Sequence, residues 1–130
     1  MAKKISKTQK KLDNTIRLVL TDVCERSLKS VEGFKWLTHQ ADFSNFPASL
    51  LITCVFDSET HYQAAAENGC TATLRNTIQT TLLKSGVRLK SQKQQIIFDT
   101  EDACQAQHNG DWTLRLGSRA GKAVPKNRPN

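Results

Sequence analysis

Apolar side chains recur at steps of three and four in the first quarter of the chain. The positions are Leu12, Ile16, Val19, Leu20, Val23, Leu28 and Val31, with Ser27 on the same face. This spacing is typical of an α-helix with one apolar face. The opposite face carries acid-before-base pairs four residues apart, namely Asp13–Arg17, Asp22–Arg26 and Glu25–Lys29, and such pairs support a helix. The pattern predicts a long amphipathic helix from about Thr8 to Val31, ended by Gly33.

Two segments after this helix have the pattern of β-strands. Residues 34–39 alternate between two faces and are rich in side chains that favour strands. Residues 49–56 form a nearly continuous apolar run, which is typical of a central strand buried on both faces. The segment between them contains Pro47 and is predicted to be a loop. We expect the two strands to pair as a long-looped hairpin.

The rest of the chain alternates helix-capping residues with short apolar runs. These predict a helix from Asp57 or Ser58 to Glu67, a helix capped by Thr71 and ended by Gly86, a strand at residues 95–98, a helix from Asp99 or Thr100 to residues 109–110, and a last turn capped by Asp111. Residues 87–90 are compatible with a further short strand. The element order is α-β-β-α-α-β-α. We therefore predict a single small α+β domain, with a three- to four-stranded sheet on which the helices pack.

The basic residues are concentrated at the two ends of the chain. Nineteen Lys and Arg outnumber twelve Asp and Glu, which gives a formal net charge of +7. Ten of the nineteen lie in residues 1–12 and 115–130, where there is no acid, so the middle keeps nine basic groups against all twelve acids. The end segments also contain too few large apolar side chains to offset the entropy of ordering their backbone. We predict disordered basic arms at 1–11 and 118–130 around a folded domain at 12–117.

Basic arms attract phosphate polymers by releasing condensed counterions, without reading a base sequence. The first hypothesis for function is a non-enzymatic binding or regulatory protein that holds DNA or RNA through its ends. The residues that would contact phosphates are Lys3, Lys4, Lys7, Lys10, Lys11, Arg119, Lys122, Lys126 and Arg128. An alternative interpretation is that the arms only keep the protein in solution. The first helix and the sheet would then bind another protein or a second copy of the chain.

A short internal echo supplies a third hypothesis. The segment from Val55 to Thr60 matches residues 97–102 in type, because each is an apolar strand ending in Phe-Asp, followed by a hydroxyl residue and an acid. If the two strands are parallel neighbours, Asp57 and Asp99 meet at their carboxyl ends. Paired carboxylates of this kind could hold Mg²⁺ and support phosphoryl transfer. The alternative is that the polar residues cap the two following helices.

No residue pattern identifies an enzyme. The common nucleotide-binding, metalloprotease and hydrolase signatures are absent, so no catalytic residue and no cofactor is predicted. Cys104 and His108 lie four residues apart and could share a helical face, but a two-residue match is weak evidence for a metal site or a thiol–imidazole couple. Cys24 and Cys54 lie among apolar residues and are interpreted as core residues.

The chain has no long apolar segment. The longest, residues 50–56, is far shorter than the roughly 20 residues that cross a bilayer. No apolar stretch of the signal-peptide type follows the basic N-terminus. We predict a cytoplasmic protein with no membrane partner.

Several strings of residues resemble a known family. They are Lys11-Leu12-Asp13-Asn14, residues 20–25, residues 33–39, Cys54-Val55-Phe56-Asp57 and Asn109-Gly110-Asp111-Trp112. Together they are similar to short gammaproteobacterial proteins often labelled Fis-family transcriptional regulators, over most of residues 8–117. Fis itself is all-helical and ends in a helix-turn-helix, whereas three strands and no such motif are predicted here. The resemblance implies a bacterial cytoplasmic protein and assigns a role to no residue.

Overall fold

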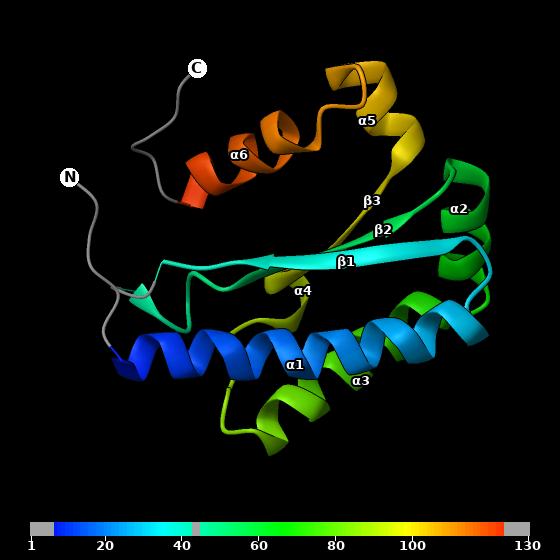
Figure 1. Ribbon diagram of the computed structural model, residues 1–130. Helices are drawn as coiled ribbons and strands as arrows, with labels where there is room; N and C mark the ends of the chain where they lie inside the picture. Colours follow the sequence, from blue (N-terminus) through cyan, green and yellow to red (C-terminus); the bar gives the residue numbers. More distant parts are fainter. Residues whose placement is uncertain (1–6, 43–44, 124–130) are drawn as a thin grey trace.

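The computed structural model describes residues 7–42 and 45–123, which form a three-stranded sheet between two layers of helices (Figure 1). The elements are α1 (Lys7–Ser30), β1 (Phe34–Gln40), β2 (Leu51–Phe56), α2 (Glu59–Glu67), α3 (Cys70–Lys84), α4 (Gln92–Gln95), β3 (Ile96–Thr100), α5 (Glu101–His108) and α6 (Trp112–Ala123). The predicted α+β class and element order are confirmed. The sequence had not predicted the short helix α4, and it had predicted only a turn where α6 lies.

The sheet has the strand order β1-β2-β3. β1 and β2 pair antiparallel, as the predicted hairpin requires, while β2 and β3 pair parallel, with Val55 opposite Asp99. β2 is the central strand, which explains its continuous apolar run. Residues 87–90 form no fourth strand, because the N–H of Val87 closes the end of α3 and the N–H of Lys90 is bound by the Gln95 side chain.

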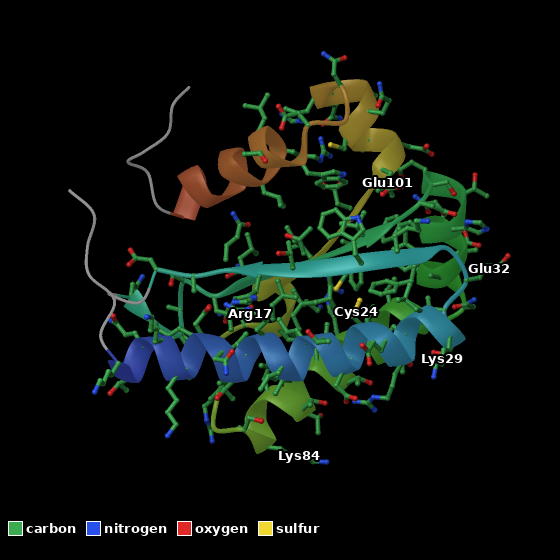
Figure 2. All side chains as sticks on the ribbon, viewed as in Figure 1. Arg17, Cys24, Lys29, Glu32, Lys84 and Glu101 are labelled. Carbon is green, nitrogen blue, oxygen red and sulfur yellow. The ribbon has the colours of Figure 1, made fainter. Side chains whose placement is uncertain are left out.

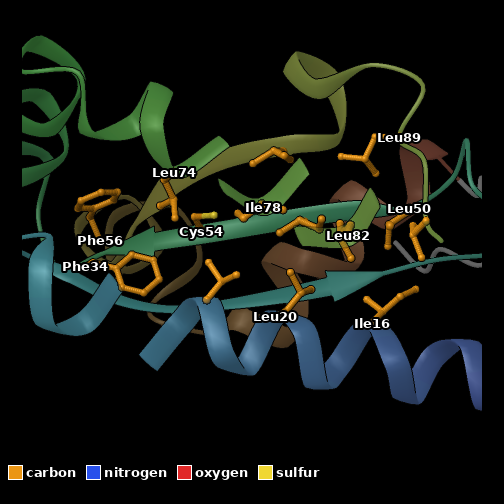
Figure 3. Packing of buried hydrophobic residues seen from close by; sticks show 14 of the residues in the cluster. Ile16, Leu20, Phe34, Leu50, Cys54, Phe56, Leu74, Ile78, Leu82 and Leu89 are labelled. Atoms are coloured by element: carbon orange, nitrogen blue, oxygen red, sulfur yellow. The ribbon is translucent and has the colours of Figure 1, made fainter. Parts of the chain in front are cut away.

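The main core lies between the sheet and the two helices α1 and α3. Ile52, Cys54 and Phe56 of β2 face this core and are fully buried. Figure 3 shows Cys54 and Phe56 packed among residues of both helices. These are Ile16, Leu20 and Val23 of α1 and Leu74, Ile78 and Leu82 of α3. Because burying one such side chain contributes roughly 1.5–3 kcal/mol, this layer supplies most of the apolar stabilisation of the fold.

The opposite face of the sheet is covered by α6. The Gln40 side chain donates from Nε2 to the carbonyl oxygen of Leu116 at 3.0 Å. The rings of Trp36 and Trp112 meet edge to face, with their centroids 4.9 Å apart. Trp36 is therefore a packing residue between β1 and α6.

The helix ends confirm some predicted caps and correct one. The hydroxyl of Ser58 accepts the N–H of His61 at the start of α2, and Thr100 caps α5 in the same way. Thr71, predicted to cap α3, is buried inside the first turn, because that helix already begins after Gly69. Gly69 has a φ of +88°, a left-handed conformation that glycine adopts without strain.

The folded domain extends beyond the predicted boundaries at 12 and 117. α1 begins at Lys7, so residues 7–11 are helical and not part of a disordered arm. α6 continues to Ala123, six residues into the predicted tail. Each of these helix ends is anchored nearby: the partly buried Leu12 packs on the core, and Arg115 is buried against the sheet. The rest of the predicted arms, residues 1–6 and 124–130, lies outside the described residues.

Candidate nucleic-acid interface

The two basic ends of the folded chain lie at the same end of the molecule. α1 begins and α6 ends at the end of the sheet where β2 and β3 start (Figure 1). Lys7, Lys10 and Lys11 are exposed on the first turns of α1. Arg119 and Lys122 belong to the last turns of α6, while Lys3, Lys4, Lys126 and Arg128 fall outside the described residues. The fold therefore brings together two segments that are about a hundred residues apart in sequence.

A loop of the folded domain adds basic groups that the sequence analysis missed. Arg88, Lys90 and Lys93 are exposed between α3 and β3. The side chain of Gln95 holds this loop in place, because its Oε1 accepts the N–H of Lys90 at 2.7 Å and its Nε2 donates to the carbonyl oxygen of Leu50 at 3.0 Å. Leu50 immediately precedes β2, so the loop lies toward the end of the sheet where α1 begins.

A signal for this loop was present in the sequence. Residues 68–98 contain five basic residues and no acid. The net charge of the chain between its two basic ends did not reveal this stretch, because the acids elsewhere in that part of the chain outnumber its five basic residues. A sliding count of charge along the chain would have found it.

Acidic side chains gather at the other end of the sheet, where β2 and β3 finish. Figure 2 labels Glu32 and Glu101 there. Glu59 and Asp102 join α2 to α5: the N–H of Glu59 donates to Asp102 Oδ2 at 3.0 Å, and the hydroxyl of Thr100 donates to Glu59 Oε2 at 2.7 Å. The described domain is thus electrically polar along its strands. A negatively charged polymer approaching it would be drawn to the basic end and repelled from the acidic end.

Two acids lie closer to the basic end. Asp13 of α1 is already bound by Arg17 Nη2 and by His39 Nε2, each at 2.8 Å. Asp42 follows β1 and is half-buried in the loop that Ser49 closes. Neither acid occupies the exposed surface formed by Lys7, Lys10 and Lys11.

Arg115, one of the ten charges counted at the ends, is a structural residue. Its Nε and Nη2 donate to the two carboxylate oxygens of Asp99 at 2.6 and 2.9 Å, and its Nη1 donates to Gln107 Oε1 at 2.8 Å. Nη1 also lies 3.1 Å from His108 Nδ1. The hydrogen bonds from the guanidinium to Asp99 raise the pKa of Arg115 further above its usual value. This cation is buried and cannot meet a phosphate.

Asp57 and Asp99 are held by different partners. Their strands are parallel neighbours, as the metal hypothesis required, but Asp99 pairs with Val55, so Asp57 lies two residues further along. Asp57 Oδ1 accepts a hydrogen bond from His61 Nδ1 at 2.7 Å, which lowers the pKa of Asp57 and raises that of His61. In the part of the chain that the structure describes, no three His, Cys, Asp or Glu side chains are grouped so as to hold a metal ion. The hydroxyl residues that follow the two aspartates, Ser58 and Thr100, cap α2 and α5.

The four cysteines are free thiols, of which Cys54 and Cys104 are buried and Cys24 and Cys70 are half-buried. Burial raises the pKa of Cys54 to about 12. Burial also raises the pKa of the Cys24 thiol, and the opposing effect of the Leu37 backbone is smaller. Cys104 is fully buried in α5, and His108 of the same helix lies against Arg115. The Cys104–His108 spacing therefore belongs to a packed helix whose histidine contacts the buried ion pair.

Comparisons with known proteins leave function to be argued from these residues. No protein-family model, no curated protein and no solved structure matches the chain. The resemblance to proteins labelled as Fis-family regulators accordingly stays a prediction. Within residues 7–42 and 45–123, no helix combines the length and the apolar character needed to cross a membrane.

Proposed function

We propose that this protein is a non-enzymatic, nucleic-acid-associated binding protein that contacts DNA or RNA phosphates with its basic end. The observation that supports this is the convergence, at one end of the sheet, of the first turns of α1, the last turns of α6 and the loop from Arg88 to Lys93. The proposal differs from the sequence hypothesis in one respect: much of the contact surface is part of the folded domain and not of flexible arms.

Contacts made only with phosphates determine the salt dependence and the sequence preference of this binding. Each lysine that neutralises a duplex phosphate contributes about −0.9 to the slope of log K against log salt concentration. Such contacts position a protein on nucleic acid but carry no base sequence information. We therefore expect strong salt dependence and little preference among sequences.

The test is fluorescence anisotropy with a labelled 20-base-pair duplex and a labelled single-stranded RNA of arbitrary sequence, from low to moderate salt. The variant Lys7→Gln/Lys10→Gln/Lys11→Gln should weaken binding to both probes and reduce the magnitude of the salt slope by about 2 to 3. Arg88→Gln/Lys90→Gln/Lys93→Gln should act in the same direction. Substitutions are preferable to deletion of residues 1–11, because that deletion would remove the first turns of α1.

A matched control removes the same charge elsewhere. Arg26, Lys29 and Lys35 are also exposed, but they lie in the second half of α1 and at the start of β1, toward the acidic end. The triple change of these three residues to Gln should leave the salt slope close to that of the unchanged chain. The proposal is wrong if the full chain binds neither probe at low salt, or if the control weakens binding as much as the variants of the basic end.

A further inference from the structure

β1 is an edge strand whose outer side has no strand partner in the described chain. Its single neighbour in the sheet is β2. Leu37, at the midpoint of β1, and Cys24 of α1 line the same groove beside this edge. Figure 1 views the molecule from this side, with β1 drawn in front of the other two strands. A seven-residue open edge is a template for pairing with another chain, and native proteins usually cover or disrupt such an edge.

A groove runs beside this edge, between β1 and α1. It has a volume of about 460 Å³. Arg17, Thr21 and Glu25 of α1 line it on one side, and Leu37 and Thr38 of β1 on the other. The side of α1 that borders the open strand is therefore the side that carries these three polar residues.

The same side of α1 forms an exposed stripe that is complementary to itself. Its members are Asn14, Arg17, Thr21, Glu25 and Leu28, spaced at steps of three and four, and all are exposed. Leu28, the apolar member of the stripe, is 50% exposed. The predicted pairs Asp13–Arg17 and Asp22–Arg26 are formed, but the predicted pair Glu25–Lys29 is not. Among the described residues, Glu25 forms no ion pair.

Antiparallel pairing of two such stripes about Thr21 matches opposite charges. Arg17 and Glu25 are equally far from Thr21, so Arg17 of one copy would face Glu25 of the other, twice. Asn14 and Leu28 are likewise equidistant from Thr21. Parallel pairing would instead place arginine beside arginine. Thr21 and Leu37, the midpoint of β1, line the same groove, so one twofold axis can pass close to both the helix and the strand.

We propose that two copies of this chain pair through the antiparallel edges of β1, with α1 packed antiparallel against α1 of the second copy. The two three-stranded sheets become one sheet of six strands, and the groove beside each β1 is covered. The basic end of each copy then lies next to the acidic end of the other, which adds charge complementarity along the strands. This surface is separate from the exposed lysines at the start of α1, so the proposal does not depend on nucleic-acid binding.

The experiment is sedimentation equilibrium of the full chain, with charge reversal at the stripe. The unchanged chain should sediment with twice the mass of one chain. Arg17→Glu and Glu25→Arg should each raise the dimer dissociation constant by about tenfold or more, because each places like charges opposite one another. The double variant Arg17→Glu/Glu25→Arg should return the dissociation constant toward that of the unchanged chain.

Arg26→Glu is the matched control. Arg17 and Arg26 are 60% and 58% exposed, and each binds an aspartate four residues earlier at 2.8 Å. Arg26 lies on the other side of α1, so its reversal has the same local cost in the helix but should not change dimerisation. A monomer at all concentrations overturns the proposal. So does a dimer that Arg17→Glu leaves intact, or one that Arg26→Glu weakens equally.

A symmetric crosslink provides a second measurement. The substitution Thr21→Cys places two thiols at the proposed twofold axis, where mild oxidation should join two chains covalently. Thr80→Cys, at an exposed position of α3, should give no more crosslinking than the unchanged chain with its own four cysteines. Equal crosslinking at both positions would overturn the proposed axis.

Discussion

Arg115 and Asp99 form a buried, two-pronged ion pair that fastens α6 to β3. The two side chains are 8% and 4% exposed, and both carboxylate oxygens accept a hydrogen bond from the guanidinium. The same guanidinium donates from Nη1 to Gln107 Oε1 in α5. One side chain therefore links the sheet to both C-terminal helices, and this face of the sheet depends on a polar contact more than on an apolar core.

Removing Arg115 should be costly for stability. Arg115→Ala leaves the carboxylate of Asp99 buried without its cation, and breaking a buried pair in this way costs about 3–5 kcal/mol. We expect the free energy of unfolding, measured in urea, to fall by that amount. Arg17→Ala breaks an exposed pair with Asp13 and should cost no more than about 1 kcal/mol. Equal effects of the two substitutions would mean that the buried pair does not fasten α6.

The His61–Asp57 contact should make stability depend on pH in two windows. The carboxylate raises the pKa of His61 above its usual 6.5, so this stabilisation is complete below pH 6.5 and is lost as pH rises through the raised value. The pKa of Asp57 is lowered from its usual 3.8, so its stabilisation is present above that value and is lost as pH falls through the lowered one.

An NMR titration of His61 checks this directly. We expect its pKa above 6.5 in the unchanged chain and closer to 6.5 in Asp57→Asn, because the hydrogen bond to Asp57 is the largest cause of the shift. A His61 pKa that is unchanged in Asp57→Asn would contradict the assignment.

Helix and strand periodicity predicted most of this fold because those patterns report burial directly. The face of α1 and the continuous apolar run of β2 are consequences of where the core lies. α6 was predicted only as a turn, because its docking depends on Arg115, a residue that looks like part of a basic tail until its distant partner Asp99 is known. Local composition cannot reveal a cation that is buried by a contact sixteen residues away.

The candidate site was predictable only in part for the same reason. The lysines at the start of α1 were identified from their sequence run, but their proximity to α6 follows from the topology of the sheet. The echo at Asp57 and Asp99 is real as a sequence pattern, yet the register separates the two carboxylates by two residues. This two-residue offset between Asp57 and Asp99 is set by the register in which β2 and β3 pair. The residue types in the two segments do not predict that register.

Gly33 should be more sensitive to substitution than Gly86, although both have a left-handed backbone. Their φ angles are +85° and +90°. A Cβ on Gly86 would meet nothing within 4 Å, so Gly86→Ala should cost only the conformational penalty of about 1–2 kcal/mol. A Cβ on Gly33 would collide with the Cβ of His61. We expect Gly33→Ala to lower the free energy of unfolding by clearly more than Gly86→Ala, and similar losses would show that α2 can move aside.

Gln95 should couple the stability of the domain to its proposed binding surface. Its buried amide satisfies the N–H groups of Lys90 and Ser91 and the carbonyl oxygens of Pro47 and Leu50. Gln95→Leu leaves these groups without a partner, and because each costs about 1–3 kcal/mol when buried, we expect a loss of about 2–4 kcal/mol in urea unfolding.

The same substitution should loosen the loop that carries Arg88, Lys90 and Lys93. Hydrogen exchange at the N–H of Lys90 should accelerate, and under folding conditions the anisotropy assay should show weaker binding to duplex DNA, because the three charges are no longer held together. Gln94→Leu, at an exposed neighbouring position, should change the free energy of unfolding by no more than about 0.5 kcal/mol. Faster exchange in Gln95→Leu with unchanged affinity would separate the two effects, and would show that this loop is not part of the binding surface.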